Sequence, residues 1–571
     1  MSGFCYISRH DRSPEFVTAA RKVTQRQFAA SGFGPPITYD DPAGVLDFYA
    51  KINYPSSDAI LLVDGFAAVA GTFFYGGAVG AEALRLFAKV RNPDEALSEA
   101  GGHFALILRR GTSTVLLRDS TGAFEVFFDD RLGVISTSFL ALARTLRQVQ
   151  MNPQEIYEYV FNGVSLGNET PVAGIHRLGF GERIVLDSVP FVEQTERPLS
   201  PPISTDNAEA GAHNIVETLL DHTAMMARVF NGRIKLALSG GYDSRFLLAL
   251  FRRNNVSPEL FVYGASNSPD VLMAQQIAAA EGLSVRHIDK SVLPAVSPED
   301  MPRLIAARFH REDGLPSGGV FDSDADLIQR ADRHASGYLH VSGGGGEVFR
   351  NFFNLFDHSI TPRQFVWLFY SQYDPVICVG NFDPRAYEDM ICSKISALLG
   401  TEKQRLDRRE VESLYPHFRC RSWFGRENSV NSRFGYSALP FYERRIANMA
   451  LAVPIRQKHF GDFEARMIRA TDPVLAAYPS NYGHSFIADA PLRARLMAIA
   501  RYMRPMSLRR YTYRIKAHLR AEVPPRILTP EFVRRVVAPD LPRMRRYFRS
   551  PPLWSSPSYS PHSRDSLAGV A

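Results

Sequence analysis

The residues that decide the fold are 234–244, which read IKLALSGGYDS. The first five form a short, mostly apolar run that is typical of a buried strand. The two glycines permit a tight turn with exposed N–H groups, and the apolar spacing over residues 246–251 predicts a helix directly afterwards. Backbone N–H groups at a helix N-terminus attract anions. The hydroxyls of Ser239 and Ser244 add donors, and the Asp243 carboxylate suits a metal ion beside a phosphate.

The same rhythm continues downstream of this turn. A strand is predicted over Leu260–Tyr263, a helix over Val271–Glu281 with Gly282 as its C-terminal stop, and a further strand over Val285–Ile288. Strands and helices that alternate at this spacing imply a parallel sheet with right-handed crossovers. Between about residues 361 and 534 the patterns are mainly helical. We therefore expect an α/β domain with a doubly wound parallel sheet and a helical C-terminal extension.

The first 195 residues have a different pattern, in which short apolar runs alternate with turn signals. These runs predict a β-rich unit with some helix, and they are Ala59–Val63, His103–Leu108, Thr114–Leu117, Glu125–Phe128 and Gly133–Ser136. A proline-rich run over 195–209 can continue neither a helix nor a central strand. We therefore predict an N-terminal domain over 1–195, a linker over 196–209, a second domain over 210–535, and a basic, disordered tail over 536–571.

Composition excludes several classes of protein. Of the 571 residues, 45% are hydrophobic and 22% are charged, a mixture typical of globular chains. No apolar run reaches the length of a membrane span, and the N-terminus has no apolar signal core. The four cysteines have no CxxC spacing, which argues against a disulfide framework or a zinc site. The net charge of +7 comes without a nucleic-acid motif. We expect a cytoplasmic protein with no membrane span and no nucleic-acid partner.

The turn Ser239–Ser244 resembles the SGGxDS pyrophosphate loop of the N-type ATP pyrophosphatases, which include asparagine synthetases, guanylate synthetases and some tRNA sulfur-transfer enzymes. Two further segments resemble the asparagine synthetase domain in particular. Phe261–Gly264 followed by Ser268–Asp270 is similar to its second strand and following helix, where the strand end contacts adenine. Val341–Glu347, which reads VSGGGGE, resembles its SGxGxD/E loop, which closes over the nucleotide. Four consecutive glycines favour a close backbone approach to a ligand.

This resemblance implies a PP-loop synthetase domain that uses ATP and Mg²⁺. Asp243 and Glu347 are the implied metal ligands and catalytic residues, with Glu347 in the place of the family's usual aspartate. The residues implied to contact the nucleotide follow the ends of the strands, and they are Leu238, Ser239, Gly240, Gly241, Asp243, Ser244, Tyr263, Gly264, Ser342 and Gly343.

The N-terminal unit resembles class II glutamine amidotransferase domains. Gly102–Ala105, then Arg118-Asp119 with Gly122, then Phe127-Phe128, is similar to the GxFA…RDxxG…LYY pattern of that class. The resemblance implies an Ntn-hydrolase-like α+β sandwich in front of the synthetase domain.

The nucleophile of that class is missing from this sequence. A working amidotransferase begins with cysteine after removal of Met1, because the free terminal amine is the base for the thiol. Position 2 is Ser2, and Cys5 lies too far along for its own amine to be terminal. We therefore expect no glutamine hydrolysis. The same state is found in β-lactam synthetases and lasso-peptide macrolactam synthetases, which join an amine already present in the substrate.

Two departures concern the later chemical steps. The β-lactam synthetases use a tyrosine inside the glycine loop, and the matching position here is Gly344. Residues 463–469 are similar to the family's EKxxLR segment, but Ala465 occupies the lysine position. Arg466 or Lys458 is expected to substitute for that lysine.

Three functions are compatible with these residues. The first is an ATP-dependent ligase that adenylates a carboxylate, releasing pyrophosphate, and joins it to an amine of the same substrate, as in lasso-type macrolactam closure. For this function we expect a peptide or small-molecule substrate and a cysteine-protease-like maturation partner. The second is an asparagine synthetase or related amidotransferase that uses free ammonia. The third is a non-catalytic scaffold, against which the intact Asp243 argues.

Overall fold

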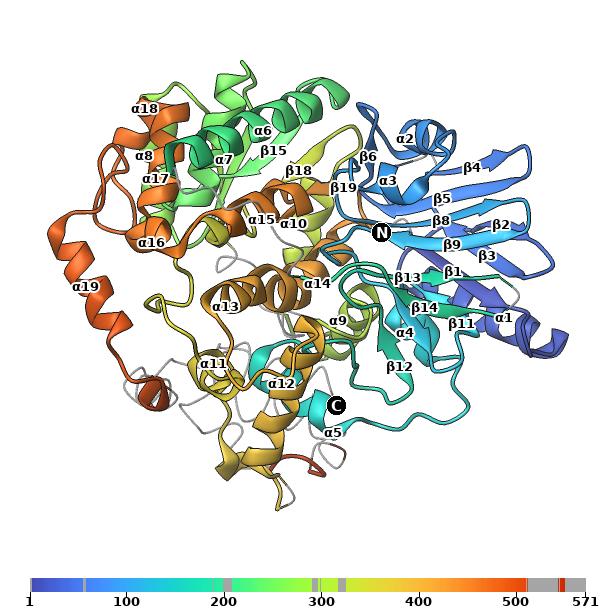
Figure 1. Ribbon diagram of the computed structural model, residues 1–571. Helices are drawn as coiled ribbons and strands as arrows, with labels where there is room; N and C mark the ends of the chain where they lie inside the picture. Colours follow the sequence, from blue (N-terminus) through green and yellow to red (C-terminus); the bar gives the residue numbers. More distant parts are fainter. Residues whose placement is uncertain are drawn as a thin grey trace.

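The computed structural model describes residues 3–54, 58–187, 189–198, 208–289, 296–297, 299–316, 325–380, 382–509, 511, 543 and 545–549. Ser2 and most of the expected linker and tail therefore lie outside the described residues. Figure 1 shows a β-rich part, coloured blue to cyan, beside a part in which helices surround a smaller sheet. The two contrasting sequence patterns thus fold into two different kinds of structure.

Two antiparallel sheets of six strands build the β-rich part. The first has the order β12-β10-β11-β1-β3-β2. Its strands are β1 (Gly3–Ser8), β2 (Ile37–Asp40), β3 (Gly44–Tyr49), β10 (Phe127–Asp129), β11 (Val134–Ser136) and β12 (Ile175–Arg177). Every residue of β1 and β3 is buried. Because successive side chains point to opposite faces, both faces of this sheet are covered.

The second sheet has the order β14-β13-β9-β8-β5-β4. Its strands are β4 (Ala59–Leu62), β5 (Gly65–Gly71), β8 (Phe104–Arg110), β9 (Ser113–Arg118), β13 (Glu182–Val185) and β14 (Phe191–Gln194). A separate hairpin joins β6 (Phe74–Tyr75) to β7 (Ala78–Val79). Each of the five runs predicted to be strands overlaps a strand of one of the two large sheets.

Side-chain alternation along β5 shows how these layers stack. Phe66, Ala68 and Ala70 belong to the core shared with the first sheet, whereas Ala67 and Val69 face a core beneath α2 (Gly80–Phe87) and α3 (Pro93–Leu97). On the far side, α1 (Pro14–Ala30) and α4 (Phe139–Ala143) pack against β1 and β11. The order helix, sheet, sheet, helix confirms the predicted α+β sandwich.

The second part contains a five-stranded sheet whose strands are all parallel. Its order is β17-β16-β15-β18-β19. The strands are β15 (Ile234–Ala237), β16 (Glu259–Tyr263), β17 (Val285–Ile288), β18 (Leu339–Val341) and β19 (Tyr436–Ala438). The chain runs outward from β15 in one direction and then returns to β18 on its other side. The loops after β15 and β18 therefore meet at a topological switch point, where doubly wound sheets bind ligands.

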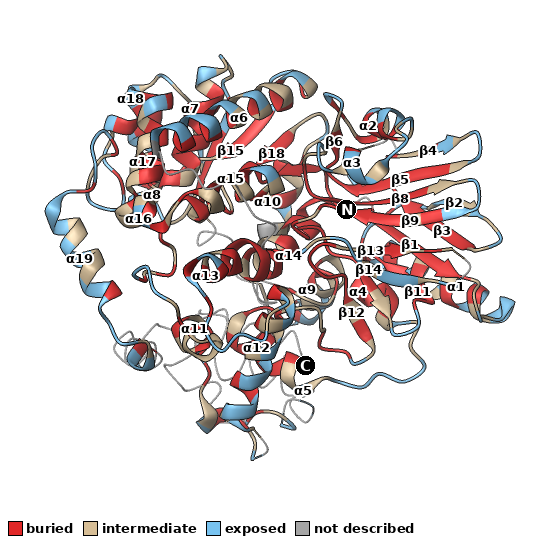
Figure 2. Cartoon of the chain, in the orientation of Figure 1, coloured by how far each residue is buried: buried red, intermediate tan, exposed pale blue. Residues whose placement is uncertain are grey.

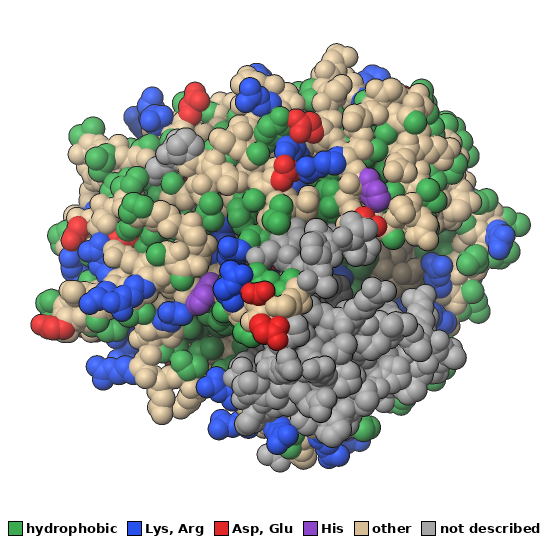
Figure 3. Space-filling view, turned by 180° about the vertical axis from the view of Figure 1, so that it is seen from behind, with side chains coloured by type: hydrophobic (Ala, Val, Ile, Leu, Met, Phe, Trp, Pro, Cys, Tyr) green, Lys and Arg blue, Asp and Glu red, His purple; other side chains and the backbone are tan. Residues whose placement is uncertain are grey.

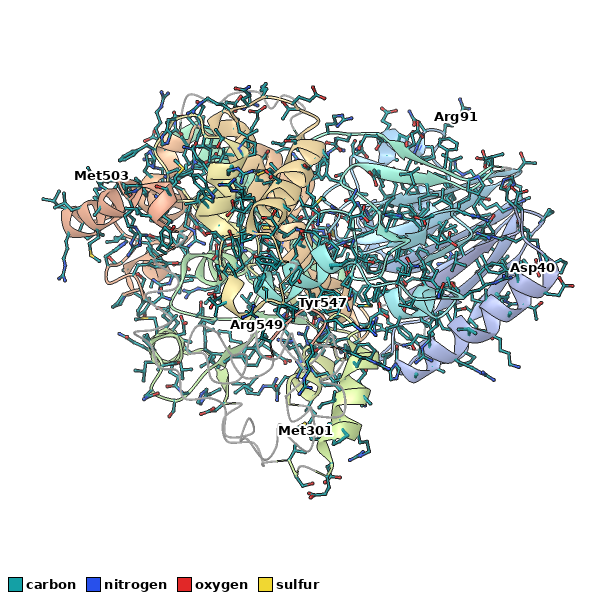
Figure 4. All side chains as sticks on the ribbon, turned by 90° about the horizontal axis from the view of Figure 1, so that it is seen from below. Asp40, Arg91, Met301, Met503, Tyr547 and Arg549 are labelled. Carbon is teal, nitrogen blue, oxygen red and sulfur yellow. The ribbon has the colours of Figure 1, made fainter. Side chains whose placement is uncertain are left out.

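Helices fill the rest of this part, as the sequence predicts. They are α6 (Ala208–Val229), α7 (Tyr242–Arg253), α8 (Pro269–Ala280), α9 (Met301–Arg311), α10 (Ala325–Arg333), α11 (Pro362–Phe369), α12 (Pro384–Leu399), α13 (Arg408–Leu414), α14 (Arg421–Asn431), α15 (Arg444–Ala452), α16 (Ile455–Lys458), α17 (Asp462–Thr471), α18 (Pro473–Ala477) and α19 (Leu492–Tyr502), with α5 (Pro153–Asn162) from the N-terminal region packed among them. Figure 2 shows burial concentrated in the sheets and the central helices, whereas α19 projects outward with exposed residues. Met503, directly after α19, is 69% exposed and lies at the edge of the molecule (Figure 4).

Part of the expected tail packs against the body of the molecule. The backbone N–H of Val379 donates to the carbonyl of Tyr547, and that of Arg549 donates to Ile377. Phe548 is 1% exposed and contacts the ring of Tyr157. Tyr547 and Arg549 are labelled in Figure 4. The prediction of a disordered tail is therefore wrong for 545–549, because the side chain of Phe548 packs in the hydrophobic core.

Charge is spread over the surface seen in Figure 3. On this face, outside the grey atoms, arginine and lysine side chains are scattered and lie among acidic ones. Among the described helices, none combines the length and apolar character required to cross a bilayer.

Candidate functional site

The turn after β15 is closed by its own serines. The backbone N–H of Ser239 donates to Oγ of Ser244 at 3.0 Å, and the two hydroxyls lie 2.9 Å apart. The N–H of Gly241 donates to Oγ of Ser239 at 3.3 Å. Leu238 donates to the carbonyl of Phe261, which extends the pairing of β15 with β16. These hydrogen bonds fix the turn, with its N–H groups at the N-terminus of α7.

One N–H group of this turn already binds a carboxylate. The N–H of Gly240 donates to Oδ1 of Asp270 at 2.9 Å, and the amide of Asn481 donates to the same oxygen at 3.2 Å. Asp270 comes from the first turn of α8, beyond the neighbouring strand β16. This N–H group thus donates to a carboxyl oxygen, the kind of partner expected at a helix N-terminus.

The second glycine loop, residues 342–347, packs directly on Asp243. A Cβ atom at Gly343 would lie 2.8 Å from Cβ of Asp243, and one at Gly346 would lie 2.0 Å from its Oδ1. Gly345 has φ +94 and approaches Tyr442. The sequence interpretation attributed these glycines to a ligand. In the structure, the close approach that Gly343 and Gly346 permit is to Asp243 of the first loop.

Arg350 occupies the point where the two loops meet. Its Nη2 donates to Oδ1 and Oδ2 of Asp243 at 3.0 and 2.9 Å and lies 3.8 Å from Oε1 of Glu347. Its Nε lies 3.0 Å from Oε2 of Glu464, which is 0% exposed. The structure therefore brings the two predicted residues Asp243 and Glu347 together and adds Glu464 and Arg350. We call these four residues the carboxylate cluster.

Burial and mutual repulsion raise the pKa values of Asp243 and Glu464. Burial raises the pKa of Asp243 to about 6, even though Arg350 opposes the shift. The pKa of Glu464 is raised well above its usual range by burial and by the nearby Asp243. Burial disfavours the charged form of Arg350, but Asp243 and Glu464 outweigh it and raise the pKa of the guanidinium. Arg350 therefore stays charged and is the fixed cation of the site.

The cluster fits a guanidinium better than a protein-bound metal ion. Both oxygens of Asp243 accept hydrogen bonds from Arg350, and Oε2 of Glu347 accepts a hydrogen bond from the Tyr415 hydroxyl. Over the described part of the chain, no three His, Cys, Asp or Glu side chains are grouped so as to hold a metal. The metal-ligand role predicted for Asp243 and Glu347 therefore does not fit this arrangement, because an arginine from the same loop takes up their charge.

The remaining predicted nucleotide residues lie at the ends of neighbouring strands. Gly264, with φ +139, follows β16, and its carbonyl lies 2.7 Å from Nε2 of His287. The hydroxyl of Tyr263 accepts a hydrogen bond from Arg333. Ser342 follows β18, and its Oγ accepts from the N–H of Gly344 at 3.2 Å. These residues share the carboxyl edge of the sheet with the carboxylate cluster.

The structure separates the two candidates for the missing lysine. Arg466 forms no hydrogen bond or ion pair with another described residue. It lies two positions after Glu464, which places it on the opposite side of α17 from the cluster. Lys458 is 1% exposed, and its Nζ lies 3.1 Å from Oε2 of Glu412. Lys458 lines a small cavity together with Glu347 and Arg350. Of the two candidates, only Lys458 lines the cavity that Glu347 and Arg350 also line.

Sequence reasoning missed Arg350 and Glu464. Glu464 lies in the segment compared with EKxxLR, but the comparison drew attention to the lysine position beside it. Arg350 follows Glu347 by three residues and comes directly after the short 3-10 helix over Gly346–Phe349. The sequence does show an arginine three residues after the acidic residue of the glycine loop. No spacing rule says which distant carboxylates such an arginine pairs with.

The N-terminal unit contributes no reactive thiol. Cys5 lies within β1 and is 1% exposed. Burial, with a smaller effect of Asp47, raises the pKa of its thiol to about 12, so the thiolate nucleophile is disfavoured.

A cavity of about 630 Å³ lies where the β-rich part meets α6 and α15. In its wall, the Glu443 carboxylate accepts hydrogen bonds from the N–H of Gly102 at 3.0 Å and from Nε2 of His222 at 2.8 Å. Asp119 also lines the cavity. No residue of either glycine loop lines it, so this cavity is distinct from the carboxylate cluster.

No family model matches the chain, and no curated protein matches its sequence. Among solved structures, glutamine phosphoribosylpyrophosphate (PRPP) amidotransferase from B. subtilis, complexed with ADP and GMP, is 10% identical over 51% of this chain and 91% of that chain, with a TM-score of 0.23. A structure described as the allosteric regulatory enzyme of purine biosynthesis is 12% identical over 54% of this chain and 78% of that chain, also with a TM-score of 0.23. At these values neither likeness carries a conclusion about this chain.

Proposed function

We propose that this protein is an ATP-dependent, AMP-forming ligase that makes an amide bond. The observation that carries the proposal is the junction of the turn 239–244 with the glycine loop 342–347 at the switch point of a parallel sheet. The substrate is ATP with its bound Mg²⁺. To bind its phosphates, the N–H groups of Gly240 and Gly241 and the hydroxyls of Ser239 and Ser244 exchange the partners they have here, which are Asp270 for Gly240 and the two serine hydroxyls for the others.

The chemistry follows from these donors and from Arg350. A substrate carboxylate attacks the α-phosphorus of ATP, the bond to the β-phosphate oxygen breaks, and an acyl-adenylate forms. Fixed donors and a fixed cation are most effective where charge develops, here on the departing pyrophosphate. Arg350 lies beside the turn with its side chain 13% exposed, so it is placed to offset that charge. An amine then attacks the acyl carbon and AMP leaves.

We infer that the amine belongs to the substrate itself. The only thiol near the start of the chain that the sequence offers is Cys5, which is buried and has a raised pKa. In our proposal this protein therefore does not release ammonia from glutamine. A tethered amine gains effective concentrations of about 10⁵ M or more when it is well oriented. The proposed product is a macrolactam, in which the N-terminal amine of a peptide joins an Asp or Glu side chain.

We also propose that the β-rich part is a degenerate class II amidotransferase-like unit that acts as a scaffold. Its helix, sheet, sheet, helix layering supports this assignment. So does the contact of Gly102, from the GxFA-like segment, with Glu443 of the second part.

Pyrophosphate release and product mass test the proposal together. The purified protein is given ATP, Mg²⁺ and candidate peptides, with Asp243→Ala as the matched inactive variant. We expect wild-type turnover to exceed that of the variant by about 10² to 10³-fold. The product should have lost one water with no nitrogen gained. Conversion of aspartate and ammonium to asparagine would favour the ammonia-dependent synthetase instead. A folded protein that binds no ATP would leave only the scaffold function.

A further inference from the structure

Helix α19 is attached to the rest of the molecule along one side only. The ring centre of Tyr502 lies 5.4 Å from those of Phe356 and His459, and Nη2 of Arg495 lies 2.7 Å from Oδ2 of Asp462. Arg495 and Tyr502 are seven residues apart, about two turns, so they share one side of the helix. Tyr502 is the one buried residue of α19. The rest of this helix is at least partly exposed and lies at the margin of the molecule (Figures 1 and 2).

An apolar stripe runs along the exposed surface of α19. Leu492, Leu496, Ile499 and Met503 follow one another at intervals of four, three and four residues, which places them on one side of a helix. Leu492 is 73% exposed and Leu496 is 56% exposed. None of the four belongs to a hydrophobic core formed by the described residues. Because large apolar side chains in water are unfavourable, a continuous stripe of them indicates an interaction surface.

Arginines without counter-ions accompany this stripe. Between residues 490 and 511 the sequence has six arginines and no acidic residue. Arg493, Arg501 and Arg504 are exposed, and none of these three side chains forms an ion pair with another residue that the structure describes. The exposed surface of α19 therefore combines apolar and positively charged side chains and has no negative charge of its own.

This combination decides which kind of partner fits. A second copy of the chain would cover the apolar stripe, but it would place arginines against arginines. A nucleic acid would match the charge, but it would leave the leucines in water. A bilayer with anionic lipids matches both features, because apolar side chains enter the boundary of the acyl chains while arginines extend to the phosphates above them.

We propose that α19 binds the surface of a bilayer that contains anionic lipids. The helix lies along the surface, with the apolar stripe in the interface and with Arg493, Arg501 and Arg504 at the lipid phosphates. Such a helix rests in the plane of the interface and does not span the bilayer, so the proposal requires no membrane-crossing segment. The inference goes beyond the ligase chemistry and does not depend on it.

Sedimentation of the full-length protein with lipid vesicles tests the proposal. One set of vesicles contains phosphatidylcholine alone, and the other contains phosphatidylcholine and phosphatidylglycerol at about 3:1. We expect wild type to bind the anionic vesicles at least about tenfold more tightly than the neutral ones, and to lose most of this binding when salt rises from about 0.1 M to about 0.5 M. Leu492→Ser/Leu496→Ser and Arg493→Gln/Arg501→Gln/Arg504→Gln should each weaken the binding at least about tenfold.

Matched controls separate α19 from the general surface. Leu61→Ser/Val63→Ser removes two exposed apolar side chains from the hairpin of β4 and β5. Arg91→Gln/Arg131→Gln/Arg147→Gln removes three charges from exposed arginines of the β-rich part. Both controls should bind the anionic vesicles within about twofold of wild type. The α19 variants change exposed side chains only, so circular dichroism should show the unfolding transition of wild type for all four proteins.

Several results would overturn the inference. Wild type that binds no anionic vesicle, or that binds neutral and anionic vesicles equally, would exclude the proposed partner. Equal binding by wild type and both folded α19 variants would place the lipid contact elsewhere. If wild type binds a DNA duplex but no vesicle, the arginines serve nucleic-acid binding instead. The salt dependence of wild-type binding needs no variant, so it tests the electrostatic part even if an α19 variant fails to fold.

Discussion

Two residues of the glycine loop, Gly343 and Gly346, are constrained by direct contact with Asp243. Gly343 and Gly346 have no room for a side chain on the side that faces this carboxylate. The same carboxylate is held on its other side by Arg350. One methyl group added to the loop would therefore displace the carboxylate of Asp243, because a close-packed interior has no free volume for it.

We expect Gly346→Ala to displace Asp243 and to reduce both stability and activity. The new Cβ would lie 2.0 Å from Oδ1 of Asp243, so either the loop or the carboxylate must move. Overpacking of this kind costs about 1–3 kcal/mol in the free energy of unfolding. Urea denaturation and pyrophosphate release measure the two effects. Gly380→Ala is the control, because a Cβ added at Gly380 would have no atom within 4 Å. Equal stability of the two variants would show that the loop is not tightly packed.

A second prediction at this scale concerns His176 and pH. Its Nδ1 lies 3.4 Å from Oε2 of Glu169, and its Nε2 lies 2.6 Å from Oδ1 of Asp130. The hydrogen bond with Glu169, with a smaller effect of Asp130, raises the pKa of His176 to about 9. A raised pKa means that the protonated form stabilises the fold. That contribution is complete below the ordinary pKa of about 6.5 and is lost as pH rises through about 9.

The comparison of wild type with His176→Gln measures this contribution. We expect the difference in free energy of unfolding to be about 1 kcal/mol near pH 6, because the imidazole is partly exposed and water screens its partners. The difference should disappear near pH 10. A difference that grows with rising pH would contradict the assignment of a protonated imidazole between two carboxylates.

At the scale of elements, the parallel sheet places the loops that matter. β15 is central, so its following loop is flanked by those of β16 and β18. The strand β19 pairs with β18 over only three residues and lies after more than 90 residues of mainly helical chain. Its sequence has no alternating pattern long enough to predict a strand, and the sheet edge supplies the partner that makes it one.

The segment 545–549 provides a prediction about an element. Its backbone pairs with 377–379, and the ring of Phe548 makes edge contacts with the rings of Tyr157 and Phe161. We expect Phe548→Ala to release this segment, because the buried ring is its main apolar anchor. Limited proteolysis should cut the variant near 545–549 faster, while global unfolding changes less, as is usual for local opening. Phe191→Ala, at a ring that is 49% exposed, is the control. Unchanged cleavage would show that the segment is held by its backbone alone.

At the scale of the whole molecule, buried ion pairs join the β-rich part to the helices. Oε1 of Glu125 lies 3.1 Å from Arg177, in the same part, and Oε2 lies 2.9 Å from Arg426 on α14. All three side chains are almost fully buried. A carboxylate shared by two buried guanidinium groups is costly to remove, because both cations are then left uncompensated.

We expect Glu125→Gln to destabilise the whole protein by about 3–5 kcal/mol, with both parts unfolding earlier. Calorimetry and urea denaturation measure the change. Glu99→Gln changes an exposed glutamate to the same residue and should stay within about 0.5 kcal/mol of wild type. If Glu125→Gln lowered the stability of one part only, the ion pairs would not couple the two parts.

The sequence by itself determined the local features of this protein. The apolar run 234–238, the two glycines after it and the spacing of the following helix fix a strand, a turn and a helix within about 20 residues, where short-range propensities suffice. Only the tertiary structure decided that Arg350 and Glu464 meet Asp243, and that the glycines of 342–347 face protein atoms. The contacts of Arg350 with Asp243 and Glu464 join residues more than 100 positions apart. Their partners are selected by strand order and packing, which no local pattern encodes, so the charge balance of the site could not be read from spacing alone.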